Sequence, residues 1–172
     1  GKAVVVVWFS PTVSYRGAGI LYQRSQCEGL RDAQQYLAAL NAAYFMVSLN
    51  TPAENNAFVS QWCQGANFPV LSDVTGRAAA AYGVARSESG IDPSAVYGPG
   101  AGQVPRGMFV FASTTYIGSD GRILYMEDQN EIGQHLRGYG RDVAIRLQGL
   151  GVKTLTALAA PPPTPKTIEL GQ

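Results

Sequence analysis

Two cysteines, Cys27 and Cys63, are the side chains of this sequence with the clearest capacity for chemistry. They are the only cysteines among 172 residues, and a single histidine accompanies them. This set is too small for a disulfide scaffold and cannot complete a zinc site. We therefore expect the two thiols to react with each other or with an oxidant, without a metal or an organic cofactor.

The composition predicts one domain followed by a tail. Hydrophobic residues make up 46% of the chain and charged residues only 15%, which at this length supplies one substantial core. We place the domain at residues 1–152 and the tail at residues 153–172. Four prolines lie between Ala159 and Pro165. Because proline cannot donate a hydrogen bond to a sheet, we predict an extended, exposed tail or linker.

Charge and hydropathy exclude two kinds of partner. The 13 Lys and Arg residues nearly balance the 12 Asp and Glu residues, and no basic run could follow a nucleic acid backbone. The longest apolar stretch, Ala3 to Phe9, is far shorter than the roughly 20 residues of a membrane-spanning helix. We expect a soluble protein of the cytoplasm or the periplasm. The first residues show no signal-peptide pattern, so the sequence does not choose between these compartments.

A buried strand opens the predicted fold. Residues 3–9 form a continuous β-branched and aromatic run, the pattern of a strand covered on both faces of a sheet. A helix follows from about Ser25, with apolar residues three or four apart between Leu30 and Leu40. The position of this helix matters for the chemistry, because it contains Cys27 close to its expected start.

The later elements complete an α/β pattern. We predict strands at 44–49, 68–71, 108–111 and 122–125, helices after Thr51, at 73–82 and at 143–150, and a loop at 85–105. Thr51 and Glu54 fit a capping box, with Pro52 in the first turn. Ser119-Asp120-Gly121 marks the turn of a hairpin between the last two strands. This order predicts a thioredoxin-like fold, with a mixed central sheet flanked by helices.

Short segments in one order along the chain carry a family resemblance. They are Phe9-Ser10-Pro11, Gly29-Leu30-Arg31-Asp32, Phe68 to Asp73, Tyr82-Gly83-Val84, Arg106 ahead of Met108-Phe109-Val110, and Ser119 to Ile123. Over about residues 2–150 the chain thereby resembles the peroxiredoxins, particularly the bacterioferritin-comigratory and thiol-peroxidase types. The resemblance implies the same thioredoxin-like fold and a thiol-dependent peroxidase activity.

The resemblance also implies roles for three residues. In this family a cysteine thiolate attacks a peroxide, becomes a sulfenic acid and is resolved by a second thiol into a disulfide. Cys63, in Gln61-Trp62-Cys63, matches the resolving cysteine of the thiol-peroxidase type, and Arg106 matches an active-site arginine. Cys27, 36 residues before Cys63, is the thiol available to attack. The implied partners are a peroxide, an external thiol reductant, and a second copy of the chain or a neighbouring redoxin domain.

The chain departs from the family at the attacking position. Counting from Pro11 places that position at Ala18, and counting back from the Gly29 segment places it at Gln23, neither of which is cysteine. One interpretation is that Cys27 has taken over, stabilised by the first turn of its helix and by Arg24, Arg31 or Arg106. The alternative is a catalytically degenerate redoxin that serves binding or assembly. A thioredoxin-type dithiol reductase is disfavoured, because no two cysteines lie two residues apart.

Some further features stay outside this chemistry. We expect His135 to be solvated or packed, and Glu127, Asp128 and Glu131 to form a solvated acidic surface. Residues 168–172 resemble the opening residues of a peroxiredoxin. Either the chain is a piece of a longer or tandem redoxin, or its order is rearranged and the tail supplies a strand.

Overall fold

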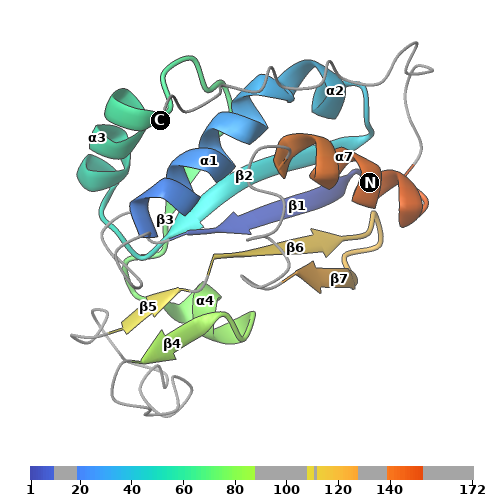
Figure 1. The fold of residues 1–172 in the computed structure, drawn as a ribbon. Coiled ribbons are helices and arrows are strands. Elements are labelled where there is room, and N and C mark those ends of the chain that lie inside the picture. Colours follow the sequence, from blue (N-terminus) through green and yellow to red (C-terminus); the bar gives the residue numbers. More distant parts are fainter. Residues whose placement is uncertain (10–18, 88–107, 111, 128–138, 153–172) are drawn as a thin grey trace, which may run out of the picture.

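The central element is a five-stranded mixed sheet in the order β3-β2-β1-β6-β7 (Figure 1). The computed structural model describes residues 1–9, 19–87, 108–110, 112–127 and 139–152. The strands of the sheet are β1 (Ala3–Trp8), β2 (Ala42–Ser48), β3 (Val70–Ser72), β6 (Ser113–Ile117) and β7 (Ile123–Glu127). A separate two-stranded sheet joins β4 (Ala85–Ser87) and β5 (Met108–Val110).

The first strand is the middle strand of the large sheet, as its composition predicts. β1 pairs in parallel with β2 and antiparallel with β6, while β2 pairs in parallel with β3. Five of the six β1 residues are buried, from Ala3 to Trp8 with Val4 partly covered. A strand with neighbours on both edges and layers on both faces has no wet side, which is the physical reason for its unbroken apolar run.

The hairpin at the end of the sheet differs from the prediction. The strand that pairs with β7 is β6, and the predicted strand at 108–111 contributes β5 to the small sheet instead. Residues 113–115 read Ser-Thr-Thr and carry no hydrophobic run, yet all three are buried. Trp8 Nε1 donates a hydrogen bond of 3.2 Å to Thr115 Oγ1, so a buried partner compensates for the polar side chain. The burial of such a polar strand depends on the strands and side chains that cover it, and the hydrophobicity of its own residues does not indicate it.

Helices cover both faces of the sheet, which confirms the α/β class. They are α1 (Gly19–Asp32), α2 (Gln34–Ala38), α3 (Pro52–Trp62), α4 (Arg77–Ala81) and α7 (Tyr139–Gly149). The larger core lies under α1, α2, α3 and α7, and includes Val5, Val7 and Leu30. The smaller core joins the opposite face of β1 and β2 to α4 through Val6 and Ala79. Residues 85–87, predicted as loop, are strand β4.

The first helix begins earlier than its apolar stripe predicts. α1 starts at Gly19 and ends at Asp32, and Cys27 is its ninth residue. The expectation that Cys27 lies in or just before the first turn is therefore wrong, because the cysteine lies in the third turn. Apolar residues at three- and four-residue spacing begin only at Leu30, and the earlier apolar residues Ile20, Leu21 and Tyr22 are consecutive, so they give no helical period.

The helix after Thr51 confirms its predicted start. Thr51 Oγ1 accepts from Glu54 N at 3.4 Å, and Thr51 N donates to Glu54 Oε2 at 2.8 Å. Farther along α3, Asn55 is buried and accepts a 2.7 Å hydrogen bond from Ser48 Oγ while donating to Leu71 O and Ser72 Oγ. These bonds attach α3 to the carboxyl ends of β2 and β3. At the other end of α3, the Trp62 ring lies beside Arg24 of α1.

Among the described helices, none is long and apolar enough to cross a membrane. The described residues also contain no group of three or more His, Cys, Asp or Glu side chains placed to hold a metal ion. Ala18, Arg106, His135, Asp128, Glu131 and the tail lie outside the described ranges.

Candidate redox site

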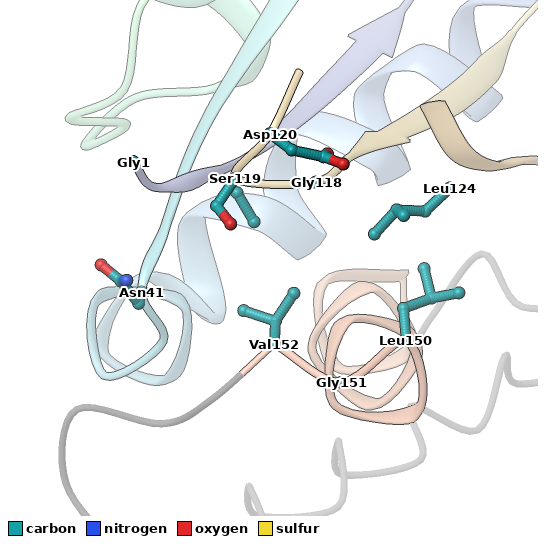
Figure 2. Close-up of a pocket in the computed structure, with 10 residues that line it drawn as sticks. Gly1, Asn41, Gly118, Ser119, Asp120, Leu124, Leu150, Gly151 and Val152 are labelled. Atoms are coloured by element: carbon teal, nitrogen blue, oxygen red, sulfur yellow. The ribbon is translucent and has the colours of Figure 1, made fainter. Parts of the chain in front are cut away.

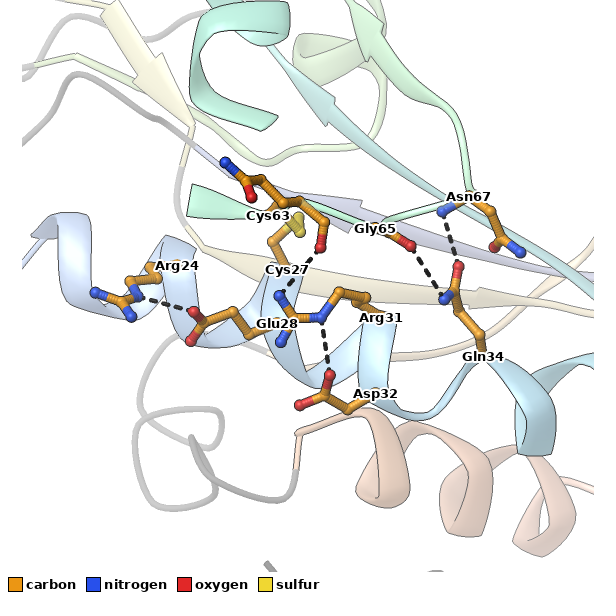
Figure 3. Close-up of a disulfide and its surroundings, with 10 residues drawn as sticks. Arg24, Cys27, Glu28, Arg31, Asp32, Gln34, Cys63, Gly65 and Asn67 are labelled. Atoms are coloured by element: carbon orange, nitrogen blue, oxygen red, sulfur yellow. Dashed lines mark hydrogen bonds and ion pairs between the residues drawn. A yellow bond between two sulfur atoms is a disulfide. The ribbon is translucent and has the colours of Figure 1, made fainter. Parts of the chain in front are cut away.

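The two cysteines form a disulfide between α1 and the end of α3 (Figure 3). Their Cα atoms are 5.8 Å apart, and both residues are fully buried. Cys27 lies in the third turn of α1, and Cys63 is the C-cap of α3, where its N–H donates to Val59 O. The bond closes with α1 folded as a continuous helix, so no unwinding of α1 is needed for the two sulfurs to meet.

Two arginines on α1 flank the disulfide. Arg24 lies three residues before Cys27 and Arg31 four residues after it, spacings that place all three side chains on one helix face. The Arg24 guanidinium carbon is 5.2 Å from the centre of the Trp62 ring, and Arg31 Nη1 donates to Gln64 O at 3.3 Å. The guanidinium groups therefore contact the residues on either side of Cys63.

Acidic neighbours on the same helix offset part of this positive charge. Arg24 Nε pairs with Glu28 Oε1 at 2.9 Å, and Arg31 Nε pairs with Asp32 Oδ1 at 2.8 Å. The side chain of Asp32 is 68% exposed, so water screens its contribution more than that of Glu28. On the side that faces α3, the two guanidinium groups contact the Trp62 ring and the Gln64 carbonyl oxygen.

A glutamine extends the attachment beyond the disulfide. Gln34 Nε2 donates to Gly65 O at 3.4 Å, and Gln34 Oε1 accepts from Asn67 N at 2.8 Å. Gly65 has a φ of 84°, a left-handed conformation that favours glycine and reverses the chain after α3. Together with the Arg31 contact, these bonds hold the segment 63–67 against α1 and α2 independently of the sulfur–sulfur bond.

The electrostatics of a reduced Cys27 follow from this geometry. The helix N-terminus does not support a thiolate there, because the dipole effect is confined to the first turn. Burial among apolar neighbours, including Leu30 and Phe58, disfavours the thiolate. Arg24 and Arg31, one turn before and one turn after Cys27 on α1, carry charge of the sign that favours a thiolate, and each is paired with a carboxylate.

Sequence reasoning identified the cysteines and arginines but missed Trp62 and Gln34 as their contacts. The stripe Arg24, Cys27, Arg31, Gln34 has the three- and four-residue spacing of one helix face, and this periodicity was the available signal. Arg106, matched to the site by family resemblance, lies outside the described residues. Gln23 is within α1, one turn before Cys27.

A cavity of about 390 Å³ lies elsewhere in the fold, beside the start of β1 (Figure 2). The turn between β6 and β7 and the end of α7 close its sides, with Asp120 and Asn41 among the polar residues and Leu124 and Val152 among the apolar ones. It shares no residue with the disulfide or its arginines.

Comparisons with known proteins agree with this architecture. The model of the AhpC/TSA family matches residues 1–125. Among solved structures, peroxidoxin BcpB of Mycobacterium tuberculosis has a TM-score of 0.59 at 17% identity, covering 86% of this chain and 79% of that one. The bacterioferritin comigratory protein of Xanthomonas campestris has a TM-score of 0.61 at 16% identity, covering 87% and 80%. No curated protein sequence matches the chain.

A further solved structure carries a cysteine substitution. A cysteine-to-serine variant of peroxiredoxin Q from Xanthomonas campestris has a TM-score of 0.61 at 16% identity and covers 87% of this chain and 79% of its own. At these identities the structural likeness shows the fold.

The fold and the bonded cysteine pair define a thioredoxin-like redoxin. The family match, which extends over most of the sequence, is more specific: the chain belongs to the AhpC/TSA family, and is a redoxin of the peroxiredoxin type.

Proposed function

We propose that this redoxin is a thiol-dependent peroxidase that reduces hydrogen peroxide or organic hydroperoxides through Cys27 and Cys63. The observation that carries the proposal is the pairing of the chain's two thiols between α1 and α3, in a peroxiredoxin-type redoxin. The solved bacterioferritin comigratory protein of Xanthomonas campestris is described as having alkyl peroxide reduction activity. In two solved variants of peroxiredoxin Q from that organism, a cysteine is replaced by serine. The two cysteines concerned lie 36 residues apart, the same separation as Cys27 and Cys63.

The proposed reaction has two steps. The Cys27 thiolate attacks one oxygen of the hydroperoxide, so an S–O bond forms, the O–O bond breaks, and the leaving oxygen takes a proton to become an alcohol or water. The Cys63 thiol then attacks the Cys27 sulfenic acid, forming the disulfide and releasing water. An external thiol reductant returns the pair to the dithiol.

Each residue of the site has a role in this scheme. Arg24 and Arg31 supply the positive charge that favours a thiolate at Cys27. This charge acts both when Cys27 attacks the peroxide and when its sulfur leaves during reduction of the disulfide. The family position of Arg106 assigns it a supporting electrostatic role. The external thiol attacks the Cys63 sulfur, so that Cys27, the cysteine on the helix of Arg24 and Arg31, is released as the thiolate.

The depth of the disulfide favours a second function. Both cysteines are fully buried, so peroxide needs a local opening of the structure to reach Cys27. In a redoxin without peroxidase activity, the same bond would simply join the two helices, and the domain would serve binding or assembly. The two functions make opposite predictions for the reduced protein.

A peroxide-consumption assay on the reduced protein separates them. Under the peroxidase proposal the wild type consumes peroxide, Cys27→Ser abolishes consumption, and Cys63→Ser completes one turnover and accumulates Cys27 sulfenic acid, detectable by mass spectrometry after dimedone trapping. Equal and negligible consumption by all three proteins would refute the peroxidase proposal and support the binding role. Circular dichroism of each variant confirms that loss of activity is not loss of fold.

The domain organisation belongs to the same proposal. Residues 1–152 constitute the redoxin domain, since the last described helix, α7, ends at Gly149 and packs on α1. Residues 153–172 constitute a proline-rich tail or linker by composition.

A further inference from the structure

Gln34, the first residue of α2, is bonded to the backbone of the segment that contains Cys63. Its Nε2 donates to Gly65 O at 3.4 Å, and its Oε1 accepts from Asn67 N at 2.8 Å (Figure 3). Both partners are backbone groups, so the amide fixes the path of the chain after Cys63. These two bonds attach the end of α3 to α2 without using either sulfur.

The segment that Gln34 holds is a closed turn. Ala66 N donates to Cys63 O at 3.1 Å, and Gly65 between them has a φ of 84°. The hydrogen bond restricts how far the residues of the turn move relative to one another. A side chain that holds Gly65 and Asn67 in place therefore also restrains Cys63.

The same side chain has a fixed position relative to Cys27. Gln34 follows Cys27 by seven residues, about two helical turns, which places both on one side of the helix. A single residue, Ala33, separates α1 from α2, and Ala33 N donates to Gly29 O at 3.1 Å, so helical bonding continues up to the junction. The Gln34 amide thus restrains Cys63 relative to the helix that carries Cys27.

This arrangement bears on the equilibrium between dithiol and disulfide. Reduction breaks the sulfur–sulfur bond and leaves the groups of the Gln34 contact unchanged. A Cys63 that is still held against α1 has a high effective concentration at Cys27, because little freedom is lost when the bond forms again. A higher effective concentration makes the disulfide harder to reduce.

We propose that Gln34 is a positioning residue for the dithiol, which keeps Cys63 within bonding distance of Cys27 in the reduced protein and thereby lowers the reduction potential of the pair. The role goes beyond the proposed peroxidase function, because it holds equally in a redoxin that serves binding. Exchange with oxidised glutathione reports it directly. In this reaction the two cysteines form one S–S bond, the glutathione S–S bond breaks, and the two thiol protons leave with two molecules of reduced glutathione.

Gln34→Met tests the proposal in mixtures of reduced and oxidised glutathione. Methionine keeps the length of the side chain and removes both polar atoms, while the disulfide still holds the segment in the oxidised form. We expect the equilibrium constant for disulfide formation to fall about two- to tenfold, the range for one net hydrogen bond. Alkylation in denaturant after acid quenching, followed by mass spectrometry, measures both forms, and samples started from either form must agree.

Gln64→Met is the matched control. Gln64 follows Cys63 directly, and its Nε2 donates to Ser60 O within α3 at 2.9 Å. The same substitution therefore removes a bond beside the cysteine that does not reach α1 or α2, and the equilibrium constant should stay within about twofold of wild type. Gln34→Ala also removes the amide and should repeat the effect of Gln34→Met. It replaces that variant if circular dichroism shows that the methionine protein does not fold.

A merely structural role for Gln34 predicts a different result. Both redox forms would then lose stability equally, and an equilibrium constant at the wild-type value would overturn the proposal. An equal fall in Gln64→Met would also overturn it, because any weakening near Cys63 would then be sufficient. No peroxide enters the measurement, so a failure to consume peroxide would refute the peroxidase proposal alone.

Discussion

Arg31 Nη1 donates a hydrogen bond of 3.3 Å to the carbonyl oxygen of Gln64, the residue that follows Cys63. This bond joins α1 to the end of α3 beside the disulfide and does not depend on the oxidation state of the sulfurs. One side chain therefore both holds Cys63 near Cys27 and supplies positive charge to the pair.

Arg31→Met should weaken the thiolate of reduced Cys27. The substitution removes a guanidinium one turn from the sulfur, so alkylation of Cys27 by iodoacetamide at neutral pH should slow about two- to fivefold, the range for a partly exposed charge interaction. The measurement is the pH dependence of alkylation in the Cys63→Ser background. Arg122→Met is the control, because the Arg122 side chain is 86% exposed in the β6–β7 turn. Equal rates in all three proteins would contradict the electrostatic role of Arg31.

Reduction of the disulfide should lower the free energy of unfolding by about 3–4 kcal/mol. The bond links residues 36 positions apart, and the loop-closure model gives this magnitude for a loop of that length. Urea denaturation with and without dithiothreitol measures the difference. The double variant Cys27→Ser/Cys63→Ser should match the reduced wild type and ignore dithiothreitol. A difference below about 1 kcal/mol would mean that Arg31 and Gln34 alone keep the segment in place.

Gly140→Ala should destabilise the protein through the contact between α7 and α1. A Cβ at Gly140 would overlap the carbonyl oxygen of Gly29 and lie 2.6 Å from the Ala33 Cβ, so the helices must separate. We expect a loss of about 1–3 kcal/mol in the free energy of unfolding, typical of overpacking. Gly149→Ala, at the other end of α7, meets no atom within 4 Å. It should be neutral or stabilising by up to about 1 kcal/mol, because alanine favours helix.

The cap of α3 should make a small contribution to stability that acid removes. Hydrogen bonds from the backbone and side chain of Thr51 lower the pKa of Glu54 below its ordinary value of 4.5. Because the folded-state pKa is the lower one, the contribution is fully present above about pH 4.5 and is lost as the pH falls through the folded pKa. Glu54→Gln should flatten this part of the stability profile between neutral and acidic pH. An unchanged profile would contradict the role of the carboxylate.

Much of the fold is readable from local pattern. The run 3–9 predicted the central strand, and Thr51, Pro52 and Glu54 predicted the start of α3, because each signal depends on residues close in sequence. The prediction for the hairpin was wrong, because β7 pairs with β6 and not with the strand expected at 108–111. Ser113, Thr114 and Thr115 gave no apolar signal, and their burial depends on the cover provided by Trp8 and by neighbouring strands.

For the site, the sequence by itself determined which thiols exist, their 36-residue separation, the arginines beside Cys27 and the family resemblance. Tertiary structure decided what surrounds them. It placed Cys27 in the third turn of α1, out of reach of the helix terminus, and brought Arg24 to Trp62 and Arg31 to Gln64. It also buried Gln26 without a partner among the described residues. Burial and contacts across helices depend on how distant segments pack, and local sequence encodes no such information.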